Sequence, residues 1–500
     1  MTRFSTIAGA AALAFLASAC SAPSAERPSV AVAQGTEQPG QQLLAATARA
    51  LGTERALRAA LTLHADYTGT SYAGEQARSP SEPIGEAGRV YRWRFDPARQ
   101  TLIRDADQTF PGGIRFSSRA ALTAEGGWTV DLLRWRTGDD LIAIPTADAL
   151  RNRLQWERFL PHLLIAQARA SAATLEAAGA DGLRFRDAAG QLIEVMLDPV
   201  TRRPLRAAQV VEGKRQSELA YLDYGRRHGV MMPARLQVYQ GDRLQEDLRL
   251  GRTLLAPVEQ ALLAPPPGYA PPPAAGEPTA REIAPGVLFF ENMPGNYHSM
   301  AVDMDDHVVL VEAPLSPAYA ELQKRILSQL RPDKPVRYVL VTHHHGDHNG
   351  GLRTWAEAGA TIVVPRGARI AIERQLQARG FAGTARIEEV ESLRSFGSGG
   401  AGVDAHVFAS SHAEAHMLVH VPRHALLFQG DLFYLPERGM VPPAFPVVRE
   451  FVEQIETLGL NVETVAGVHG RPGTMEEVRE SLRRSEQQRR ISLWRGAGPA

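Results

Sequence analysis

The sequence predicts two folded domains of the α+β class: an N-terminal antiparallel β-rich domain with covering helices, and a C-terminal domain in which strands and helices alternate. Three observations lead to this prediction. A length of 500 residues is too great for one compact core, since domains usually hold about 100 to 200 residues. A proline-rich segment at 264–280 ends helices and central strands alike, so we place the domain boundary there. The hydrophobic pattern differs on its two sides.

The composition is that of an ordinary globular chain without net charge. Lys and Arg number 55, Asp and Glu also number 55, and apolar residues make up 44% of the chain. These values argue against wholesale disorder, a multi-span membrane protein and binding to nucleic acid through bulk charge. The expected partner is a small-molecule substrate, and the sequence gives no indication of the oligomeric state.

Residues 1–19 have the pattern of an export signal. One positive charge precedes an apolar run at 7–17, which is shorter than the roughly 20 residues that cross a bilayer, and a small-residue cleavage motif ends at Ala19. The stretch resembles a bacterial lipoprotein signal, in which Cys20 becomes the lipidated first residue, although Leu16 stands four residues before the cysteine rather than three. Ordinary secretion with a free thiol is the alternative. Both readings place the mature protein in the periplasm or cell envelope, and lipidated Cys20 would tether it to the membrane.

The N-terminal domain is expected at 41–263, after a flexible tether at 20–40 that is rich in Pro, Ser, Gly and Gln. Helical patterns occupy 41–63 and 148–178, and the remainder alternates like antiparallel strands, as at 192–197. We expect a curved meander of strands with one or two covering helices. Loosely, this arrangement resembles the half-barrel carriers of lipids in the bacterial periplasm.

The C-terminal domain is expected at 281–500 and has α/β organisation. Short apolar runs predict strands at 287–290, 308–311, 336–341 and 361–364. Amphipathic patterns predict helices at 318–330, 352–358, 369–376 and 447–458.

The strongest chemical signal follows directly on one of these strands, where residues 342–351 read THHHGDHNGG. Alternate residues His343 and His345 point to one side of an extended turn and are suited to share one cation. Asp347 and His348 follow where the chain bends and are suited to a second cation. Zinc takes such donors in sets of three or more with an exchangeable water, so further ligands are expected elsewhere.

Those further candidates stand at later strand ends. His416 begins an apolar strand, Asp431 follows the strand 425–428, and His469 follows the strand 464–466. In chain order, the whole set resembles the ligand pattern of the metallo-β-lactamase superfamily: His343, His345, Asp347, His348, His416, Asp431 and His469. The resemblance covers about residues 281–475.

This resemblance implies an αββα sandwich with a dinuclear site at one edge. The metals are usually zinc, so two Zn²⁺ per chain are expected, with iron or manganese as alternatives. The implied roles are as follows: His343, His345 and His416 hold the first metal, Asp347, His348 and His469 hold the second, and Asp431 bridges them opposite a shared hydroxide, the nucleophile. Asp347 and Tyr434 are the predicted catalytic residues.

Asp431 also bears on the reaction. Within the superfamily, true β-lactamases typically lack a bridging aspartate, whereas glyoxalase II-like thioesterases, lactonases and phosphodiesterases carry one. Tyr434 resembles the lactonase tyrosine that polarises a substrate carbonyl, although packing is the ordinary role of such a tyrosine. We predict an exported hydrolase of an ester, thioester, lactone or related bond. The alternatives are a periplasmic β-lactamase, and an envelope lipid-binding protein in which 41–263 is the carrier and the metal domain is auxiliary.

Two positions depart from the family pattern. Glu312 ends the strand 308–311, where the family commonly has an aspartate that supports the metal loop, and we assign Glu312 that supporting role. His412-x-x-Ala415-His416 replaces a glycine-rich His-x-x-Gly-His, which makes this turn less permissive.

Other polar residues are expected to have ordinary roles. His344 points away from its neighbours and is not expected to bind metal. Residues 296–298 form either a substrate contact or a plain surface loop. His406, His420 and His424 lie on alternating strand patterns and are expected at the surface.

Overall fold

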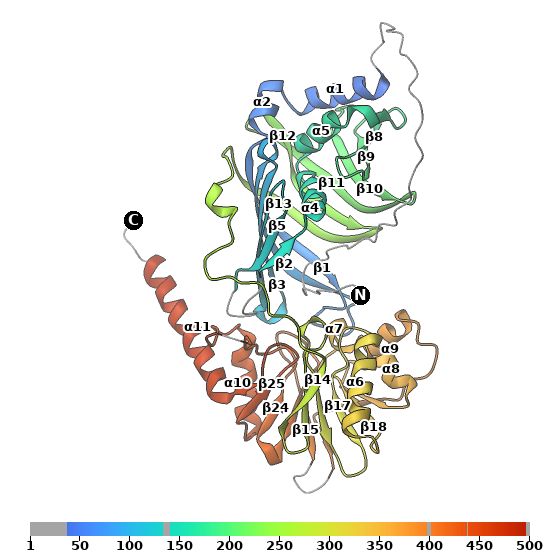
Figure 1. The fold of residues 1–500 in the computed structure, drawn as a ribbon, viewed down its shortest axis with the longest axis vertical. Coiled ribbons are helices and arrows are strands. Elements are labelled where there is room, and N and C mark those ends of the chain that lie inside the picture. The colour runs from blue at the N-terminus through green and yellow to red at the C-terminus, as the bar shows by residue number, and fades with distance from the viewer. Residues whose placement is uncertain (1–37, 134–140, 398–401, 438, 497–500) are drawn as a thin grey trace.

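The computed structural model describes residues 38–133, 141–397, 402–437 and 439–496. The predicted signal sequence, Cys20 and nearly all of the predicted tether lie outside these ranges. Two domains are stacked along the long axis of the molecule (Figure 1). Among the described residues, no helix combines the length and the apolar character needed to span a membrane.

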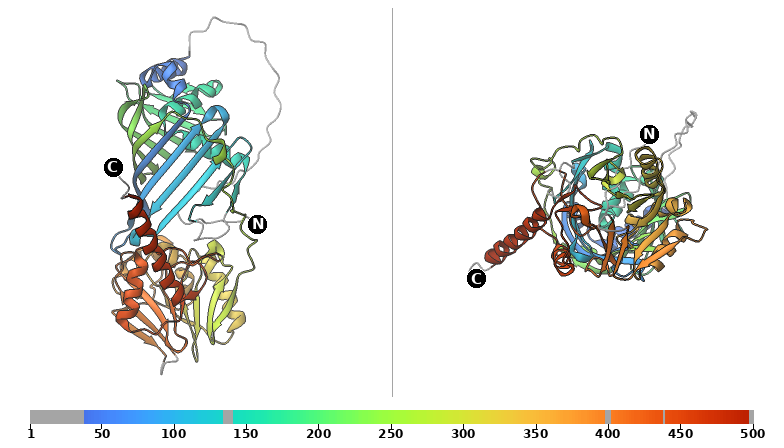
Figure 2. Two further views of the ribbon diagram at one scale, coloured as in Figure 1. Left: turned by 90° about the vertical axis from the view of Figure 1, so that its left-hand side faces the viewer. Right: turned by 90° about the horizontal axis from the view of Figure 1, so that it is seen from below.

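The N-terminal domain is built on one antiparallel sheet of 13 strands in the order β6-β5-β4-β3-β2-β1-β13-β12-β11-β10-β9-β8-β7. Its first strands are β1 (Leu63–Gly74), β2 (Ile84–Asp96), β3 (Thr101–Thr109), β4 (Arg115–Leu122), β5 (Gly127–Asp131) and β6 (Ile142–Ile144). The others are β7 (Glu176–Ala177), β8 (Gly182–Arg186), β9 (Leu192–Leu197), β10 (Pro204–Val211), β11 (Lys214–Arg227), β12 (Val230–Gln240) and β13 (Arg243–Leu254). The predicted meander of antiparallel strands is therefore confirmed, and the strands run obliquely across the domain (Figure 2).

Helices cover one face of this sheet (Figure 1). They are α1 (Pro39–Leu51), α2 (Glu54–Ala59), α4 (Thr146–Glu157) and α5 (Pro161–Ala170). Each of the two predicted helical segments is split in two, because Gly52 ends α1 and Pro161 can only begin a helix. Aromatic side chains fill the space between these helices and the sheet: Trp93 stacks on Phe95 with ring centroids 5.6 Å apart.

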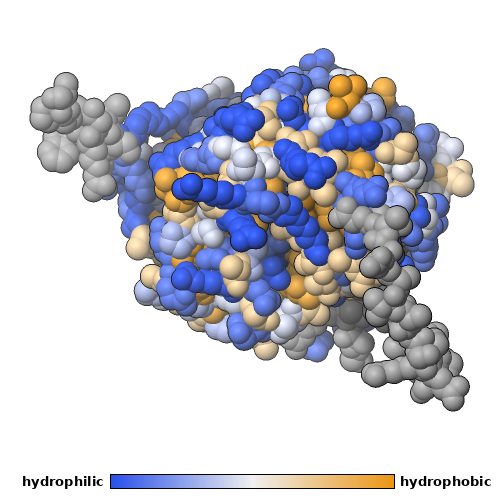
Figure 3. Space-filling view, turned by 90° about the horizontal axis from the view of Figure 1, so that it is seen from above, coloured by the Kyte–Doolittle hydropathy of each residue, from blue (hydrophilic) through white to orange (hydrophobic). Residues whose placement is uncertain are grey.

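The end of the molecule that carries α1 shows mainly hydrophilic residues with small hydrophobic areas between them (Figure 3).

The start of the proline-rich segment and the residue before it, Leu263, pack on the N-terminal domain. The Trp128 indole N–H donates to the carbonyl of Leu263 at 2.7 Å, and the Tyr269 hydroxyl donates to the carbonyl of Asp131 at 2.6 Å. The next strand begins at Thr279. This segment is thus fixed at its start, as its proline content favours.

The C-terminal domain contains two sheets. The first has the order β14-β15-β16-β17-β18-β19-β20, and the second has the order β21-β22-β23-β24-β25-β26. The first is formed by β14 (Thr279–Ala284), β15 (Val287–Glu291), β16 (Met300–Asp303), β17 (Val308–Val311), β18 (Val336–Leu340), β19 (Thr361–Pro365) and β20 (Ile387–Val390). The second is formed by β21 (Leu393–Phe396), β22 (Val403–Phe408), β23 (His416–Val421), β24 (Leu426–Phe428), β25 (Thr464–Ala466) and β26 (Gly473–Thr474).

The two sheets face each other and helices cover their outer sides. The helices are α6 (Pro317–Leu330), α7 (Gly346–Asn349), α8 (Leu352–Glu357), α9 (Arg369–Ala378), α10 (Val447–Leu458) and α11 (Met475–Gly496). Buried residues of both inner faces, such as Leu310 and Val419, belong to one hydrophobic core that also includes Ile326 of α6. Leu418, on the other face of β23, packs in a second core with Phe451 of α10. The predicted αββα sandwich is therefore confirmed.

Two hairpin loops of the N-terminal domain rest on the sandwich. In the β1–β2 loop (residues 75–83), the Glu75 carbonyl accepts a hydrogen bond from the backbone N–H of Gly346 at 3.0 Å. In the β3–β4 loop (residues 110–114), buried Ile114 packs in the same hydrophobic core as Val447 of α10. The domains are thus joined by an interface as well as by the connecting chain.

Candidate metal centre

The loop after β18 carries the histidine motif and is hydrogen-bonded to a buried carboxylate. Glu312 is fully buried at the end of β17, and its carboxylate accepts a hydrogen bond from the Thr342 backbone N–H at 2.9 Å. Its second oxygen lies 3.4 Å from Nδ1 of His348. Glu312 therefore stands in the supporting position expected for it.

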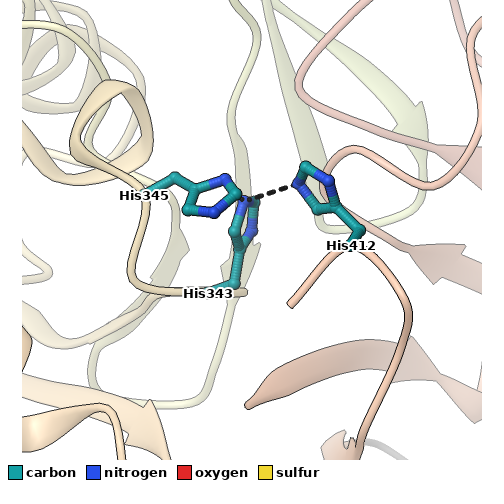
Figure 4. Close-up of side chains that lie close together, drawn as sticks. All are labelled: His343, His345 and His412. Carbon is teal, nitrogen blue, oxygen red and sulfur yellow. Dashed lines mark hydrogen bonds between the residues drawn. The ribbon is translucent and has the colours of Figure 1, made fainter. Parts of the chain in front are cut away.

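Three buried histidines converge beside this loop. Nε2 of His343 lies 3.0 Å from Nδ1 of His345 and 3.2 Å from Nε2 of His412 (Figure 4). Four-coordinate zinc with bonds of about 2.0 to 2.1 Å to nitrogen places its ligand atoms roughly 3.3 Å apart. The two distances match the spacing of donors around one cation, and each of the three histidines offers a ligand atom within 4.8 Å of the others.

The structure brings His412 to this group in place of His416, which is a correction to the ligand set expected from the sequence. His416 is the first residue of β23, and its Nε2 donates to the carbonyl of Gln429, directly after the next strand, at 2.9 Å. Its ring stacks on that of His343 with centroids 5.0 Å apart, so it packs behind the group. His412 lies in the loop before β23, which reaches over the site. The sequence marked both histidines but gave no signal for choosing between them.

The remaining predicted ligands form a second group. Asp347, His348, Asp431 and His469 each offer a ligand atom within 4.8 Å of the others. Oδ1 of Asp431 lies 3.1 Å from Nε2 of His348 and 3.4 Å from Nε2 of His469. Its other oxygen, Oδ2, lies 3.6 Å from Nε2 of His412 in the first group. Asp431 therefore stands between the two groups, in the bridging position expected for it.

Burial and charge give the two groups opposite protonation. Burial lowers the pKa of His343 and His345 well below the usual value, and neighbouring histidines lower it further, so both are neutral. Burial opposes a charge on His348 as well, but the carboxylates of Asp431 and Asp347 raise its pKa well above the usual value. The second group thus gathers negative charge, which a proton on His348 or a metal ion in its place would offset.

The donor atoms fit divalent metal ions. Oδ1 of Asp431 and Nε2 of His348 are buried and face each other at 3.1 Å, and neither atom has a hydrogen bond of good geometry among the described residues. Unpaired buried polar atoms are costly, and neutral imidazoles next to carboxylates are the donors that Zn²⁺ takes. The two groups are therefore candidate sites for two neighbouring ions.

Loops of the N-terminal domain make the outer contacts of the first group. Nε2 of His345 donates to the carbonyl of Ala77 at 3.0 Å, and Nδ1 of His412 donates to the carbonyl of Pro111 at 3.2 Å. A carbonyl only accepts, so each contact places the proton on one ring nitrogen and leaves the lone pair on the other. The free lone pairs are those of His345 Nδ1 and His412 Nε2, the atoms that face His343.

The second group has outer contacts from both domains. The Gln76 side-chain amide of the β1–β2 loop donates to Oδ1 of Asp347 at 2.6 Å. The Tyr297 hydroxyl donates to Oδ2 of the same residue at 3.0 Å. Tyr297 is therefore a buried residue of the site that contacts a candidate ligand, so the plain surface loop expected as one alternative is wrong for this residue. No motif in the sequence pointed to Gln76, Ala77 or Pro111.

Tyr434 and His344 lie close to these groups without joining them. Tyr434 is buried, and its ring lies 5.3 Å from that of His469, centroid to centroid. His344 is buried, and burial lowers its pKa to about 4. His344 belongs to neither group, in keeping with its predicted orientation.

Comparisons with known proteins give matches to the C-terminal part of the chain. Residues 292–488 match the family model of the metallo-beta-lactamase superfamily. Among solved structures, a metallo-beta-lactamase from Pontibacter korlensis is 19% identical and matches over 42% of this chain and 99% of its own, with a TM-score of 0.34. The metallo-beta-lactamase FIM-1 from Pseudomonas aeruginosa, in its mono-zinc form, is 15% identical over 43% and 98% of the two chains, with a TM-score of 0.34.

A sulfatase is also similar. The sec-alkylsulfatase Pisa1 from Pseudomonas sp. is 15% identical over 44% of this chain and 43% of its own, with a TM-score of 0.33. Among curated proteins, none matches the sequence.

Proposed function

We propose that this protein is an exported metal-dependent hydrolase of an ester, thioester, lactone or related bond. The match of residues 292–488 to the family model of the metallo-beta-lactamase superfamily supports this proposal. The observation that carries the proposal is the position of Asp431, whose two oxygens face two separate groups of ligands. A carboxylate so placed suits a pair of metal ions, which is the arrangement of the ester-cleaving branches of the superfamily.

The ligand set of the proposal follows the structure. His343, His345 and His412 would hold one ion, Asp347, His348 and His469 the other, and Asp431 would contact both. Zinc suits these donors best, with iron and manganese as alternatives. When bound, such ions supply Lewis acidity and lower the pKa of water from 15.7 to about 7.

The chain's own residues orient the ligands and shape the site. Tyr297 and Gln76 hold the two oxygens of Asp347, and Glu312 supports His348. Tyr434 stands beside His469, and the lactonase resemblance would give its hydroxyl the role of polarising a substrate carbonyl. The two N-terminal loops cover the site, so we propose that both domains form one catalytic unit.

The interior of the N-terminal domain does not favour the carrier alternative. Trp93, Phe95 and Phe159 pack ring against ring between the sheet and its helices. Side chains thus occupy the space that a lipid would need. Co-purified lipid together with no hydrolysis by the whole chain would still favour the carrier.

The test is a hydrolysis screen of the full-length, metal-loaded protein. Chromogenic esters, thioesters, lactones, phosphodiesters and the β-lactam nitrocefin are compared for the wild type, His343→Ala, Asp347→Ala and the matched control His424→Ala. We expect turnover of an ester-type substrate by the wild type and His424→Ala, and none by the other two. Full activity in all four proteins would overturn the proposal, and turnover of nitrocefin alone would favour the β-lactamase.

Export and lipidation are a separate part of the proposal. They rest on the pattern of residues 1–20. Labelling cells with radioactive palmitate and fractionating them should place labelled wild type in the membrane and unlabelled Cys20→Ser in the soluble periplasmic fraction. Cytoplasmic retention of the wild type would contradict export, and unlabelled wild type in the periplasm would contradict lipidation.

A further inference from the structure

A third group of potential ligands lies on the outer face of the second sheet. Asp404 and His406 on β22 and His420 on β23 each offer a ligand atom within 4.8 Å of the others. The two histidines were expected at the surface, but the structure buries them: His406 is 9% exposed and His420 is 4% exposed. The proposed hydrolase site uses none of the three.

The register of the two strands brings these side chains together. Asp404 and His406 are two residues apart, so both point to the same face of β22. Asp404 is paired directly with His420 across the antiparallel ladder. The group is separate from the metal centre, because His420 lies four residues along β23 from His416, about 13 Å at the usual rise per residue.

Hydrogen bonds leave lone pairs of this group unused. Nε2 of His420 donates to the carbonyl of Asn461 at 2.9 Å, so Nδ1 keeps its lone pair. That Nδ1, and Nε2 of His406, are buried with no hydrogen-bond partner among the described residues. Asp404 accepts one hydrogen bond, from the Ser395 hydroxyl at 2.5 Å. Buried lone pairs beside a carboxylate repel each other unless a cation lies between them.

We propose that Asp404, His406 and His420 bind a divalent transition-metal ion, with zinc as the probe. Two imidazoles and one carboxylate make a three-ligand set that leaves a coordination position for water. Asn461, which follows α10, holds the ring of His420 as an outer contact. The ion joins β22 to β23 and thereby braces the sheet at a distance from the proposed hydrolase centre.

The site is tested by counting metal in the full-length protein. Wild type, Asp404→Asn and His406→Gln are dialysed against equal concentrations of free zinc, and bound zinc is measured by mass spectrometry. His424→Gln is the matched control, a histidine of the same domain whose Nε2 donates to the carbonyl of Pro285 at 2.9 Å. Asp404→Asn keeps the shape and an acceptor for Ser395, so it is the variant least disturbing to the fold.

We expect the wild type and His424→Gln to bind one more equivalent than Asp404→Asn and His406→Gln. With Co²⁺ in place of zinc, the visible absorption of that equivalent should be missing from the same two variants. Hydrolysis by Asp404→Asn should equal that of the wild type, which separates this site from the hydrolase centre. Equal metal content in all four proteins would overturn the proposal. It would mean that Asp404, His406 and His420 share a proton rather than a metal ion.

Discussion

Replacing Gln76 with leucine is expected to weaken metal binding in the C-terminal domain, although Gln76 belongs to the other domain. The Gln76 amide donates to Oδ1 of Asp347 at 2.6 Å. Leucine has a similar volume and no donor, so the substitution removes this hydrogen bond and leaves the loop filled. Asp347 would then lose one of the two contacts that fix its orientation, and Tyr297 would keep the other.

The size of the effect follows from the contact. Hydrogen bonds to a charged group contribute about 1.5 to 3 kcal/mol. The Asp347 side chain is 24% exposed, so water partly replaces the lost donor and the lower end applies. At about 1.4 kcal/mol per factor of ten, zinc affinity at this site should fall about tenfold, within the range of roughly 10 to 100 seen when outer contacts of metal ligands are removed.

The assay is competition for zinc between the protein and a chromophoric chelator. Gln245→Leu is the matched control, because Gln245 is a half-buried glutamine of the same domain whose amide donates to the backbone carbonyl of Arg243. A second variant acts through the backbone: a Cβ on Gly85 would lie 2.0 Å from the carbonyl oxygen of Gln76, so Gly85→Ala must shift the loop. Gly225→Ala is its control, since a Cβ there meets nothing within 4 Å.

If Gln76→Leu and Gly85→Ala bind both zinc ions as tightly as the wild type and the controls, the N-terminal loops do not position the ligands. The melting temperature of the metal-free protein is measured for every variant. If Gly85→Ala binds zinc more weakly and also melts at a lower temperature, the substitution has damaged the fold. In that case, the zinc affinity of Gln76→Leu alone decides whether the N-terminal loops position the ligands.

Three further predictions concern other contacts. His412→Ala should lose one equivalent of zinc and at least about a hundredfold in kcat/KM, whereas His416→Ala should keep both zinc ions; metal analysis and kinetics would show the reverse if His416 were the ligand. Burial lowers the pKa of His162 to about 4, so His162 takes up its proton at a lower pH in the folded protein than in the unfolded chain. The free energy of unfolding should therefore fall by about 2 kcal/mol from pH 7 to pH 5. Denaturant titrations should show this fall reduced in His162→Gln, and an unchanged fall would contradict the assignment. Asp187→Ala should lower the free energy of unfolding by about 3 to 5 kcal/mol, because Arg158 would remain charged and buried, and a loss below 1 kcal/mol in the same titration would show that Arg158 finds another partner.

Much of the candidate metal centre was predictable because its candidate ligands follow strand ends. The motif at 342–348 lies directly after β18, and Asp431 and His469 follow β24 and β25, all at one edge of the two sheets. Periodicity also gave the bounds of α10 correctly, since its apolar face repeats without interruption.

The choice between His412 and His416 was not predictable, because it depends on which ring faces Gln429 and which reaches over the site. The outer contacts were equally hidden. Ala77 and Pro111 act through backbone carbonyls, and every residue type carries one. Only the fold brings those carbonyls to the histidines.

The reach of these outer contacts bears on how the protein matures. The contact between Ala77 and His345 joins positions 268 residues apart, and contacts of such separation form late, after each half has its own structure. Until the halves dock, the histidine rings are free to exchange tautomers and to turn. We therefore expect tight metal binding only after docking, and a half-assembled chain that meets zinc early should hold it only loosely.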